Sequence, residues 1–204
     1  LHKEYRRQRQ MCIRDRTVLH LHQGSPKQVS EMLLEGEADI GVATEAVADY
    51  PGLLNLPCYR WSHSIIVPKG HPLSAHEGGI SLSQLSRYPI ITYGRGYTGR
   101  AHIDEAFARA GITPDIVMTA MDADVIKTYV ELELGVGIVA AVAWDAERDT
   151  RLCAIDARHL FEINLTRLAI RRGAWLRGYA FHFIEMFVPT LTRAVVDQAL
   201  KGEG

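Results

Sequence analysis

Hydrophobic and polar residues follow two different periods along the chain from Thr17 onwards. Residues 17–23, TVLHLHQ, alternate between two faces, which predicts a half-buried strand. Residues 25–36, SPKQVSEMLLEG, place apolar side chains at helical spacing, and residues 38–44, ADIGVAT, form a short apolar run. This order of strand, helix and strand predicts a β-α-β unit, which is typical of a parallel sheet.

The predicted helix at residues 25–36 carries its own start and stop signals. Ser25 is suited to the N-cap, with Pro26 at the first helical position and Gln28 where a capping box needs it. Gly36 follows the last turn and predicts the C-terminal stop. We therefore expect both ends of this helix to be set locally.

The same alternation continues towards the C-terminus. Strands are predicted at WSHSIIVP, PIITYG, DIVMTA, VGIVAAVA and LTRLAIRRG, and helices at SLSQLSRY, RAHIDEAFARAG and DADVIKTYVELELG. Asp122 is a good N-cap, and Gly135 predicts the end of the helix that follows it. The closing AWLRGYAFHFIEMFVPTLTRAVVDQAL is helical with an interruption at Pro189. This pattern predicts an α/β fold, and so many short elements favour two small lobes over one large sheet.

Residues 1–16, LHKEYRRQRQMCIRDR, differ from the rest of the chain. They are rich in arginine and show no periodicity that continues into the next segment. We expect either a tract that is not native to the protein or a disordered basic segment, and we exclude these residues from the fold prediction.

Composition narrows the possible functions. The 204 residues are 47% hydrophobic with a formal net charge of -1, which predicts a globular chain without the basic surface that binds nucleic acid by itself. No apolar run is long enough for a membrane span and no secretory signal is recognisable, so we expect a cytoplasmic location. Cys12, Cys58 and Cys153 are odd in number and far apart, which favours buried, inert thiols over disulfides or a zinc site.

The segment TYGRGYTGRAHIDEAF, residues 92–107, is the strongest candidate for a binding site. Its three glycines follow the G-x-G-x-x-G order of dinucleotide-binding loops, between a predicted strand and a predicted helix. Arg95 and Tyr97 are bulky where such loops need small residues, and Asp122 is better explained as a helix cap than as a ribose ligand. These residues disfavour a nicotinamide site.

The same turn can instead place an anion at the start of a helix. Thr98 directly precedes the predicted helix, so its hydroxyl and the N–H groups of Gly99, Arg100 and Ala101 can converge on one ligand. The alternative without a ligand is that Thr98 only caps its helix. Thr44 lies at the carboxyl end of the first β-α-β unit, where open α/β sheets bind ligands. One hydroxyl from each lobe would suit a small oxyanion or a compact amino-acid derivative.

Other chemical motifs are weaker. His20 and His22 face one side of a predicted strand, but no third ligand lies at a metal-binding spacing nearby, so a solvated histidine face is favoured. No nucleophile elbow, zinc-protease motif or Walker loop occurs in the sequence. We therefore expect no catalytic residue, no metal site and no cofactor.

Four longer segments together form a recognisable pattern: QGSPKQVSEMLLEGEADIGVATEA, LPCYRWSHSIIVPKGHPL, ITYGRGYTGRAHIDEAFARAGITPDIVMTAMDADVIKTYVELELGVGIVA and the closing FVPTLTRAVVDQAL. They resemble the effector-binding domain of LysR-type transcriptional regulators, and within that family the activators of cysteine-biosynthesis genes. The combination of GVATEA, GYTGR and DADVIKTYV is specific to this family.

The resemblance implies a particular version of the α/β fold. It implies two Rossmann-like lobes of the type II periplasmic-binding-protein fold, joined by two crossover strands, with the effector held between them. Lobe I would consist of residues 17–61 and 165–204 and would be incomplete, and lobe II would consist of residues 62–164.

The resemblance also implies which residues bind the effector. The threonines of the ATEA and TGR motifs, Thr44 and Thr98, would bind sulfate or the inducer, with Trp61 near the same cleft. The turn around these positions adds the following residues to the expected site: Gly96, Tyr97 and Gly99.

For the intact protein, the resemblance implies a DNA-binding regulator of sulfur assimilation and cysteine biosynthesis. Its effector would be an acetylserine-type inducer or a sulfur oxyanion such as sulfate or thiosulfate, and it would act as a homo-oligomer, a tetramer. The family's winged helix-turn-helix domain is not recognisable here, so DNA would be bound through a domain missing from this chain. Two rival hypotheses are a solute-binding protein for an oxyanion or amino acid and, less favoured, a nicotinamide-dependent enzyme. We expect a protein that is not an enzyme and has no membrane partner.

Overall fold

The computed structural model describes residues 18–75, 79–97 and 99–202, and these residues form two compact units. Unit 1 contains the described residues up to Cys58 together with those from Leu168 onwards. Unit 2 contains the described residues of the segment between them. Residues 1–16, whose origin the sequence left open, lie outside the described residues.

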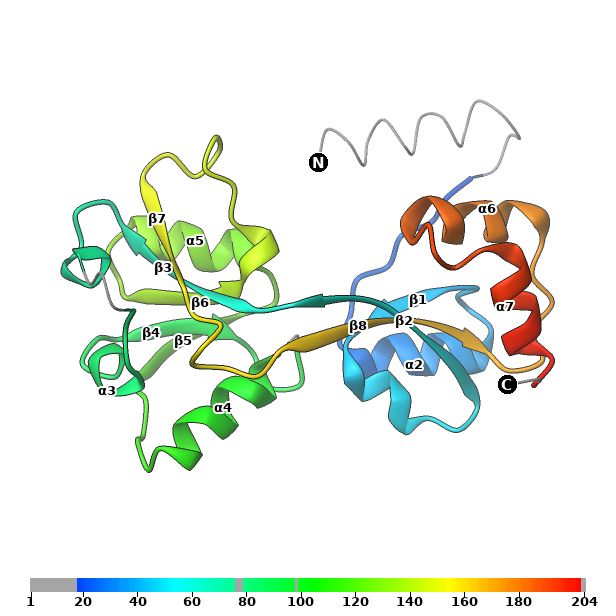
Figure 1. The fold of residues 1–204 in the computed structure, drawn as a ribbon, viewed down its shortest axis with the longest axis horizontal. Helices are drawn as coiled ribbons and strands as arrows, with labels where there is room; N and C mark the ends of the chain where they lie inside the picture. The colour runs from blue at the N-terminus through cyan, green and yellow to red at the C-terminus, as the bar shows by residue number, and fades with distance from the viewer. Residues whose placement is uncertain (1–17, 76–78, 98, 203–204) are drawn as a thin grey trace. The chain divides into compact units, whose positions relative to one another are not determined.

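Two strands join the units along the chain. β2 (Leu53–Trp61) begins in unit 1 and ends in unit 2, and β8 (Asn164–Arg171) runs from unit 2 back into unit 1 (Figure 1). The two crossover strands implied by the family resemblance are therefore β2 and β8. The sequence patterns predicted β8 directly, whereas they did not indicate β2 as a separate strand.

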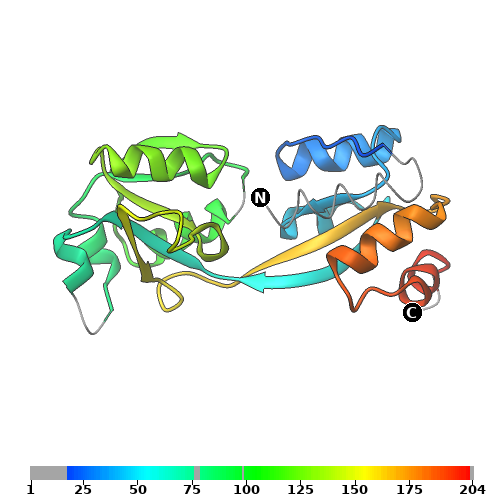
Figure 2. The same ribbon diagram turned by 90° about the horizontal axis from the view of Figure 1, so that it is seen from above.

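Unit 1 contains a three-stranded sheet with helices packed against it. The strand order is β1-β8-β2, with β1 at Gly41–Ala43. The helical elements are α2 (Pro26–Glu35), the 3-10 helix η1 (Glu45–Asp49), α6 (Gly178–Phe187) and α7 (Arg193–Leu200). α6 and α7 lie side by side (Figure 2). Leu168 and Ile170 of β8 pack with Ile184 of α6 and Val196 of α7 in one buried cluster.

The local signals for the helices of unit 1 are confirmed. The Ser25 hydroxyl accepts a hydrogen bond from the Gln28 N–H at 3.3 Å, and the Gln28 side chain accepts one from the Ser25 N–H at 2.8 Å. Gly36 ends α2 in the left-handed conformation with a φ of 79°. α6 ends at Phe187, ahead of Pro189. These bonds are made within a few residues, which is why the sequence predicts them.

The prediction of a strand at residues 17–23 is wrong for the part that the structure describes. Residues 18–23 form no regular element, and Val18 and Leu21 are exposed. A strand needs a neighbour for its hydrogen bonds, and none of the described residues supplies one to this segment. β1 pairs instead with β8, from the opposite end of the chain.

Unit 2 is built on a five-stranded mixed sheet in the order β5-β4-β6-β3-β7. Its strands are β3 (His63–Pro68), β4 (Ile90–Tyr93), β5 (Ile116–Ala120), β6 (Val136–Ala140) and β7 (Leu152–Asp156). Its helices are α3 (Leu82–Leu85), α4 (Arg100–Arg109) and α5 (Ala123–Glu131), with 3-10 turns η2 (Pro72–Ala75) and η3 (Ala141–Ala143). β4 is parallel to β5 and β6, whereas β3 is antiparallel to β6 and β7. The strands that alternate with helices along the chain, β4, β5 and β6, therefore form the parallel part of this sheet, as the sequence predicted.

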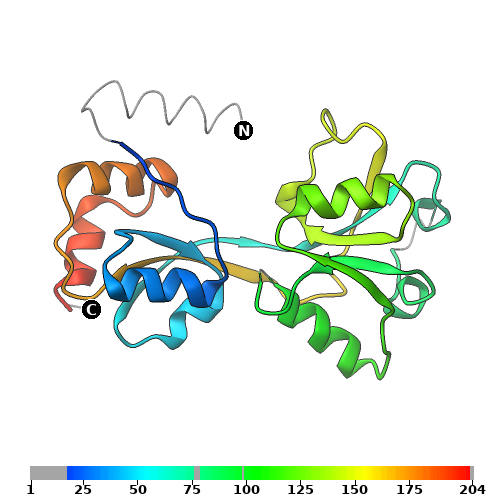
Figure 3. The ribbon, with the colours of Figure 1, turned by 180° about the vertical axis from the view of Figure 1, so that it is seen from behind.

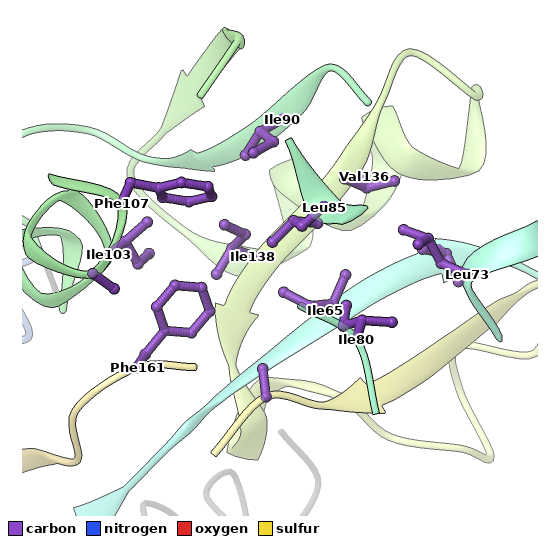
Figure 4. Close-up of a cluster of buried hydrophobic side chains, with 13 residues drawn as sticks. Ile65, Leu73, Ile80, Leu85, Ile90, Ile103, Phe107, Val136, Ile138 and Phe161 are labelled. Atoms are coloured by element: carbon purple, nitrogen blue, oxygen red, sulfur yellow. The ribbon is translucent and has the colours of Figure 1, made fainter. Parts of the chain in front are cut away.

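α4 and α5 cover opposite faces of the unit 2 sheet (Figure 3). Ile65 of β3 packs with Ile103 and Phe107 of α4 in the cluster shown in Figure 4. Its neighbour Ile66 packs with Ile126 of α5 on the other face. Successive side chains of a strand point to opposite faces, so a strand covered on both sides is apolar throughout. The mainly apolar runs of β3, β4 and β6 follow from this double burial.

Gly135 does not have the predicted role of ending α5. The helix already ends at Glu131, with Leu132 as its C-cap, and Glu133 adopts a positive φ of 59°. Glycine is needed at position 135 for a different reason, because a Cβ there would lie 2.6 Å from the Pro89 carbonyl oxygen. The residue allows a close backbone approach and does not act as a cap.

The cysteines of the described ranges are free thiols. Cys58 and Cys153 are half-buried, and Cys12 lies outside the described residues. Burial raises the pKa of the Cys58 thiol. A backbone hydrogen bond at Leu168 lowers this pKa, but by less. A protonated thiol is a poor nucleophile, which agrees with the expectation of an inert Cys58, although this thiol is less buried than predicted.

Candidate functional site

The glycine-rich segment forms a tight turn between β4 and α4. The Tyr97 N–H donates to the Gly94 carbonyl at 3.1 Å, and the Arg100 N–H donates to the Tyr97 carbonyl at 3.0 Å. Gly96 and Gly99 have φ values of 81° and 67°, in the region that favours glycine. The turn therefore depends on glycine at these two positions for its backbone path.

α4 begins directly after this turn, at Arg100. Its N-cap is Gly99, which has no side chain with which to cap the helix. Thr98, predicted as a ligand or alternatively as a cap, lies outside the described residues. The first N–H groups of any helix lack an intrahelical acceptor, and the helix dipole makes this end attractive to an anion.

Gly99 is packed against two buried polar side chains. A Cβ at this position would lie 2.7 Å from the Asn164 Oδ1 atom and 2.7 Å from the His63 Nε2 atom. Both distances are too short for a real side chain, so the start of α4 fits only a glycine. The structure thereby brings residues of β3, β8 and the α4 turn together.

His63 and Asn164 are both fully buried, with 0% of each residue exposed. Neither ring nitrogen of His63 and neither side-chain polar atom of Asn164 has a hydrogen-bond partner among the described residues. Our sequence analysis missed both residues. The available signal for His63 was a histidine beside the apolar run of WSHSIIVP, whereas Asn164 lies in a segment without a recognisable pattern.

The environment of His63 keeps its imidazole neutral. Burial, and secondarily the charge of His102, lower the pKa of His63 to about 4. Its ring makes edge contacts with the rings of Trp61 and Phe161, at centroid distances of 5.2 Å and 5.3 Å. At neutral pH this site therefore offers one N–H donor and one nitrogen acceptor, without charge.

Trp61, the aromatic residue predicted near the site, lies in unit 2 beside His63. Its side chain is buried, and its Nε1–H donates to the Thr166 hydroxyl at 3.0 Å. This hydrogen bond ties the end of β2 to the start of β8. Trp61 is connected to the α4 turn through His63, which contacts Trp61 on one side and approaches Gly99 on the other.

Two further residues of the turn have structural partners. The Arg100 Nη1–H donates to the Tyr93 carbonyl at 2.6 Å and its Nε–H to the Asp104 carboxylate at 2.8 Å. The Tyr97 hydroxyl lies 3.3 Å from the Met121 sulfur. The buried Arg100 side chain therefore secures the start of α4 to the end of β4.

Thr44 lies between β1 and η1 in unit 1 and is half-buried. It occupies the N-cap position of η1, but its hydroxyl makes no capping hydrogen bond. This leaves the hydroxyl open to another partner. The glycine turn belongs to unit 2, so a site shared by Thr44 and Thr98 stays a prediction.

The geometry of the turn gives little support to the nicotinamide hypothesis. The Tyr97 ring occupies the space beside Gly94, 3.3 Å from the position of a Cβ there. Asp122, the candidate ribose ligand, caps α5 by accepting a hydrogen bond from the Val125 N–H at 3.0 Å. Asp122 is therefore confirmed as a helix cap.

One group of side chains within the described ranges has the composition of a metal site. His102, Glu105 and Glu162 bring their ligand atoms within 4.8 Å of one another. The two glutamates are exposed, and Glu162 forms an ion pair with Arg109 at 2.6 Å. The hydrogen bond from Arg109 lowers the pKa of Glu162. His20 and His22 are exposed, as predicted, but residues 18–23 form no strand on which they could share a face.

The class of protein follows from this architecture. A two-unit α/β chain with two connecting strands and a glycine turn at a helix start matches the type II periplasmic-binding-protein fold of LysR effector-binding domains. The crystal structure of the cofactor-binding domain of the Cbl transcriptional regulator is similar, with a TM-score of 0.82 and 41% identity. The match covers 88% of this chain and 78% of that domain.

The chain belongs to the LysR substrate binding domain family, whose family model matches residues 15–192. The HTH-type transcriptional regulator SsuR of Burkholderia cenocepacia is 54% identical over 183 residues, 90% of this chain and 59% of SsuR. The regulator CysB of the same organism is 50% identical over 185 residues, 91% of this chain and 59% of CysB. The chain thus spans somewhat more than half the length of these relatives.

The family model and these relatives identify the class of protein to which the chain belongs. It is the effector-binding domain of a LysR-type regulator, similar to SsuR, CysB and Cbl. The relatives are transcriptional regulators and not enzymes, which confirms the prediction of a chain that is not an enzyme and removes support from the nicotinamide hypothesis. Among the described helices, none has the length and apolar character needed to cross a bilayer.

Proposed function

We propose that this chain is the effector-sensing part of a DNA-binding transcriptional regulator of sulfur assimilation and cysteine biosynthesis. The similarity to SsuR, CysB and Cbl supports this CysB-like assignment. We identify unit 1 with lobe I and unit 2 with lobe II of the predicted domain. Its effector is an acetylserine-type inducer or a sulfur oxyanion such as sulfate or thiosulfate.

The observation that carries the proposal is the start of α4 at Gly99. This ten-residue helix begins at a glycine turn that leaves its first N–H groups without a capping side chain among the described residues. Such a helix start binds carboxylate or oxyanion groups without a bound cation. The hydroxyls of Thr44 and Thr98 complete this site, together with Trp61 and the turn at Gly96 and Tyr97.

For the intact protein, we propose that effector binding changes the affinity for operator DNA. An effector that binds one arrangement of the two lobes more tightly shifts the population towards it. A cytoplasmic homotetramer would transmit this shift to DNA-binding domains that lie outside this chain. Differential affinity for the two arrangements is the physical source of the response.

The test is isothermal titration of the intact protein with sulfate, thiosulfate, O-acetylserine and N-acetylserine. We expect at least one of these to bind, and Thr98→Val and Thr44→Val to weaken that binding about tenfold or more, since each removes a hydroxyl donor from an anion. Thr128→Val is the matched control, because its hydroxyl donates to the Asp124 carbonyl within α5, away from the turn. Absence of binding by all four compounds would overturn the proposal, and binding of NAD(H) instead would favour the nicotinamide-dependent enzyme.

A further inference from the structure

Gly99 lies where three segments of unit 2 meet. Asn164 is the first residue of β8, and His63 is the first residue of β3, two positions after the end of β2. Both side chains approach Gly99 to within 2.7 Å of the place where its Cβ would be. The start of α4 is thus in direct contact with the first residue of β8, and it is connected to the end of β2 through His63, whose ring contacts Trp61.

The polar atoms at this meeting point are not satisfied in the described structure. His63 and Asn164 are fully buried, and their four side-chain polar atoms have no partner among the described residues. Buried polar groups without hydrogen bonds are costly, so a partner supplied by a ligand or by the adjoining turn would stabilise this site. These two side chains lie against the N-terminus of a ten-residue helix whose N-cap, Gly99, supplies no capping side chain.

The two side chains have complementary hydrogen-bonding capacity. A neutral imidazole offers one donor and one acceptor, and an amide side chain offers both as well. Together they can pair with the N–H and C=O of a peptide group in the adjoining turn. An effector bound at the start of α4 would contact the same turn, so effector binding and this pairing would be coupled.

We propose that His63 and Asn164 are positioning residues of the effector site, which hold the α4 turn in its ligand-bound arrangement and connect it to β2 and β8. This inference rests on the proposed function, since it assigns a role within the same site. Trp61 and Thr166 support it, because their hydrogen bond ties β2 to β8 beside His63. A displacement of Gly99 therefore reaches both connecting strands through direct contacts.

The experiment compares ligand-free stability with effector affinity in the intact protein. His63→Phe and Asn164→Leu keep the approximate volume and remove the polar atoms. We expect the melting temperature without ligand to stay unchanged or to rise, because no hydrogen bond in the described structure is lost. We expect the affinity for the binding probe among sulfate, thiosulfate, O-acetylserine and N-acetylserine to fall about tenfold.

Two further variants separate positioning from general structure. His63→Gln retains a donor and an acceptor, and we expect it to bind the probe more tightly than His63→Phe. Ser30→Ala is the control, because the buried Ser30 hydroxyl donates to the Pro26 carbonyl at 2.9 Å within unit 1. We expect it to lower the melting temperature and leave the affinity unchanged.

The outcomes distinguish this inference from the proposed function. If the unsubstituted protein binds a probe and His63→Phe and Asn164→Leu bind it equally well, the inference is overturned and the proposed function stands. A large loss of ligand-free stability with unchanged affinity also overturns it, since the pair would then be purely structural. If the unsubstituted protein binds none of the four probes, the proposed function fails and this inference fails with it.

Discussion

Gly99 combines two constraints at a single residue. Its φ of 67° favours glycine, and His63 and Asn164 occupy the space in which a side chain would begin. Gly96, in the same turn, has a similar φ of 81° but nothing within 4 Å of its Cβ position. A side chain at Gly96 would therefore meet only backbone strain, whereas a side chain at Gly99 would meet backbone strain and a steric clash.

We predict that Gly99→Ala destabilises the protein more than Gly96→Ala. Left-handed backbone strain costs about 1 kcal/mol at either position. At Gly99 the clash with two fully buried side chains adds about 1–3 kcal/mol. Urea unfolding of both variants measures the difference, and equal losses of stability would show that the pair moves aside freely.

The protonation of His63 provides a second prediction at this scale. Burial holds its pKa at about 4 in the folded protein, against 6.5 as the ordinary value. The unfolded chain therefore binds the proton more tightly, and the contribution of His63 to stability is full above pH 6.5 and is lost as the pH falls towards 4. The total change is about 3 kcal/mol.

Unfolding curves at neutral and at mildly acidic pH measure this dependence. His63→Phe should lose less stability on acidification than the unsubstituted protein, because the contributions of the other titratable groups are common to both. The same pH dependence in both proteins would assign the effect to other groups.

At the scale of elements, the helix caps depend on residues that are close together in the sequence. Ser25, Ser81, Asp122 and Thr192 each accept a hydrogen bond from an N–H three residues further on. α4 differs from these helices, since its N-cap is a glycine next to the candidate site. The helix that begins at the candidate site thus has no side-chain cap at its N-cap position.

We predict that Asp122→Ala lowers the free energy of unfolding by about 1 kcal/mol, the usual effect of losing an N-cap. Asp122→Asn should retain most of the stability, because an amide oxygen also caps. Neither variant should change effector affinity, since Asp122 is engaged with the Val125 N–H. A loss of affinity in Asp122→Ala with unchanged stability would return Asp122 to the list of ligand residues.

At the scale of the whole molecule, the two units are joined by β2 and β8. The hydrogen bond from Trp61 to Thr166 links residues 105 positions apart in the sequence and lies in the unit 2 portions of these strands. Both side chains are buried, so neither can exchange this bond for one with water. The bond thus holds β2 and β8 together at Trp61 and Thr166.

We predict that Thr166→Val costs about 1–3 kcal/mol, because it leaves the Trp61 N–H buried without an acceptor. Trp61→Phe removes the donor, and the double variant should be less unstable than the sum of the single variants. A thermodynamic cycle on these proteins measures the coupling. Additive losses would indicate that the bond contributes no specific stability.

The sequence by itself determined the features whose partners lie within a few residues. The capping box of α2, the cap at Asp122 and the break before Pro189 are local, and the α/β alternation follows from apolar periodicity. The glycine turn before α4 was also predicted, since its spacing is visible in a short segment, and its role in binding stays a prediction.

Only the tertiary structure decided the features that depend on distant partners. It showed that residues 18–23 form no strand, that β1 pairs with β8, and that Gly135 allows a close approach to Pro89. It also brought His63 and Asn164 to Gly99, from positions far apart in the sequence. Burial and strand pairing are properties of the assembled sheet, so no periodicity within one segment encodes them.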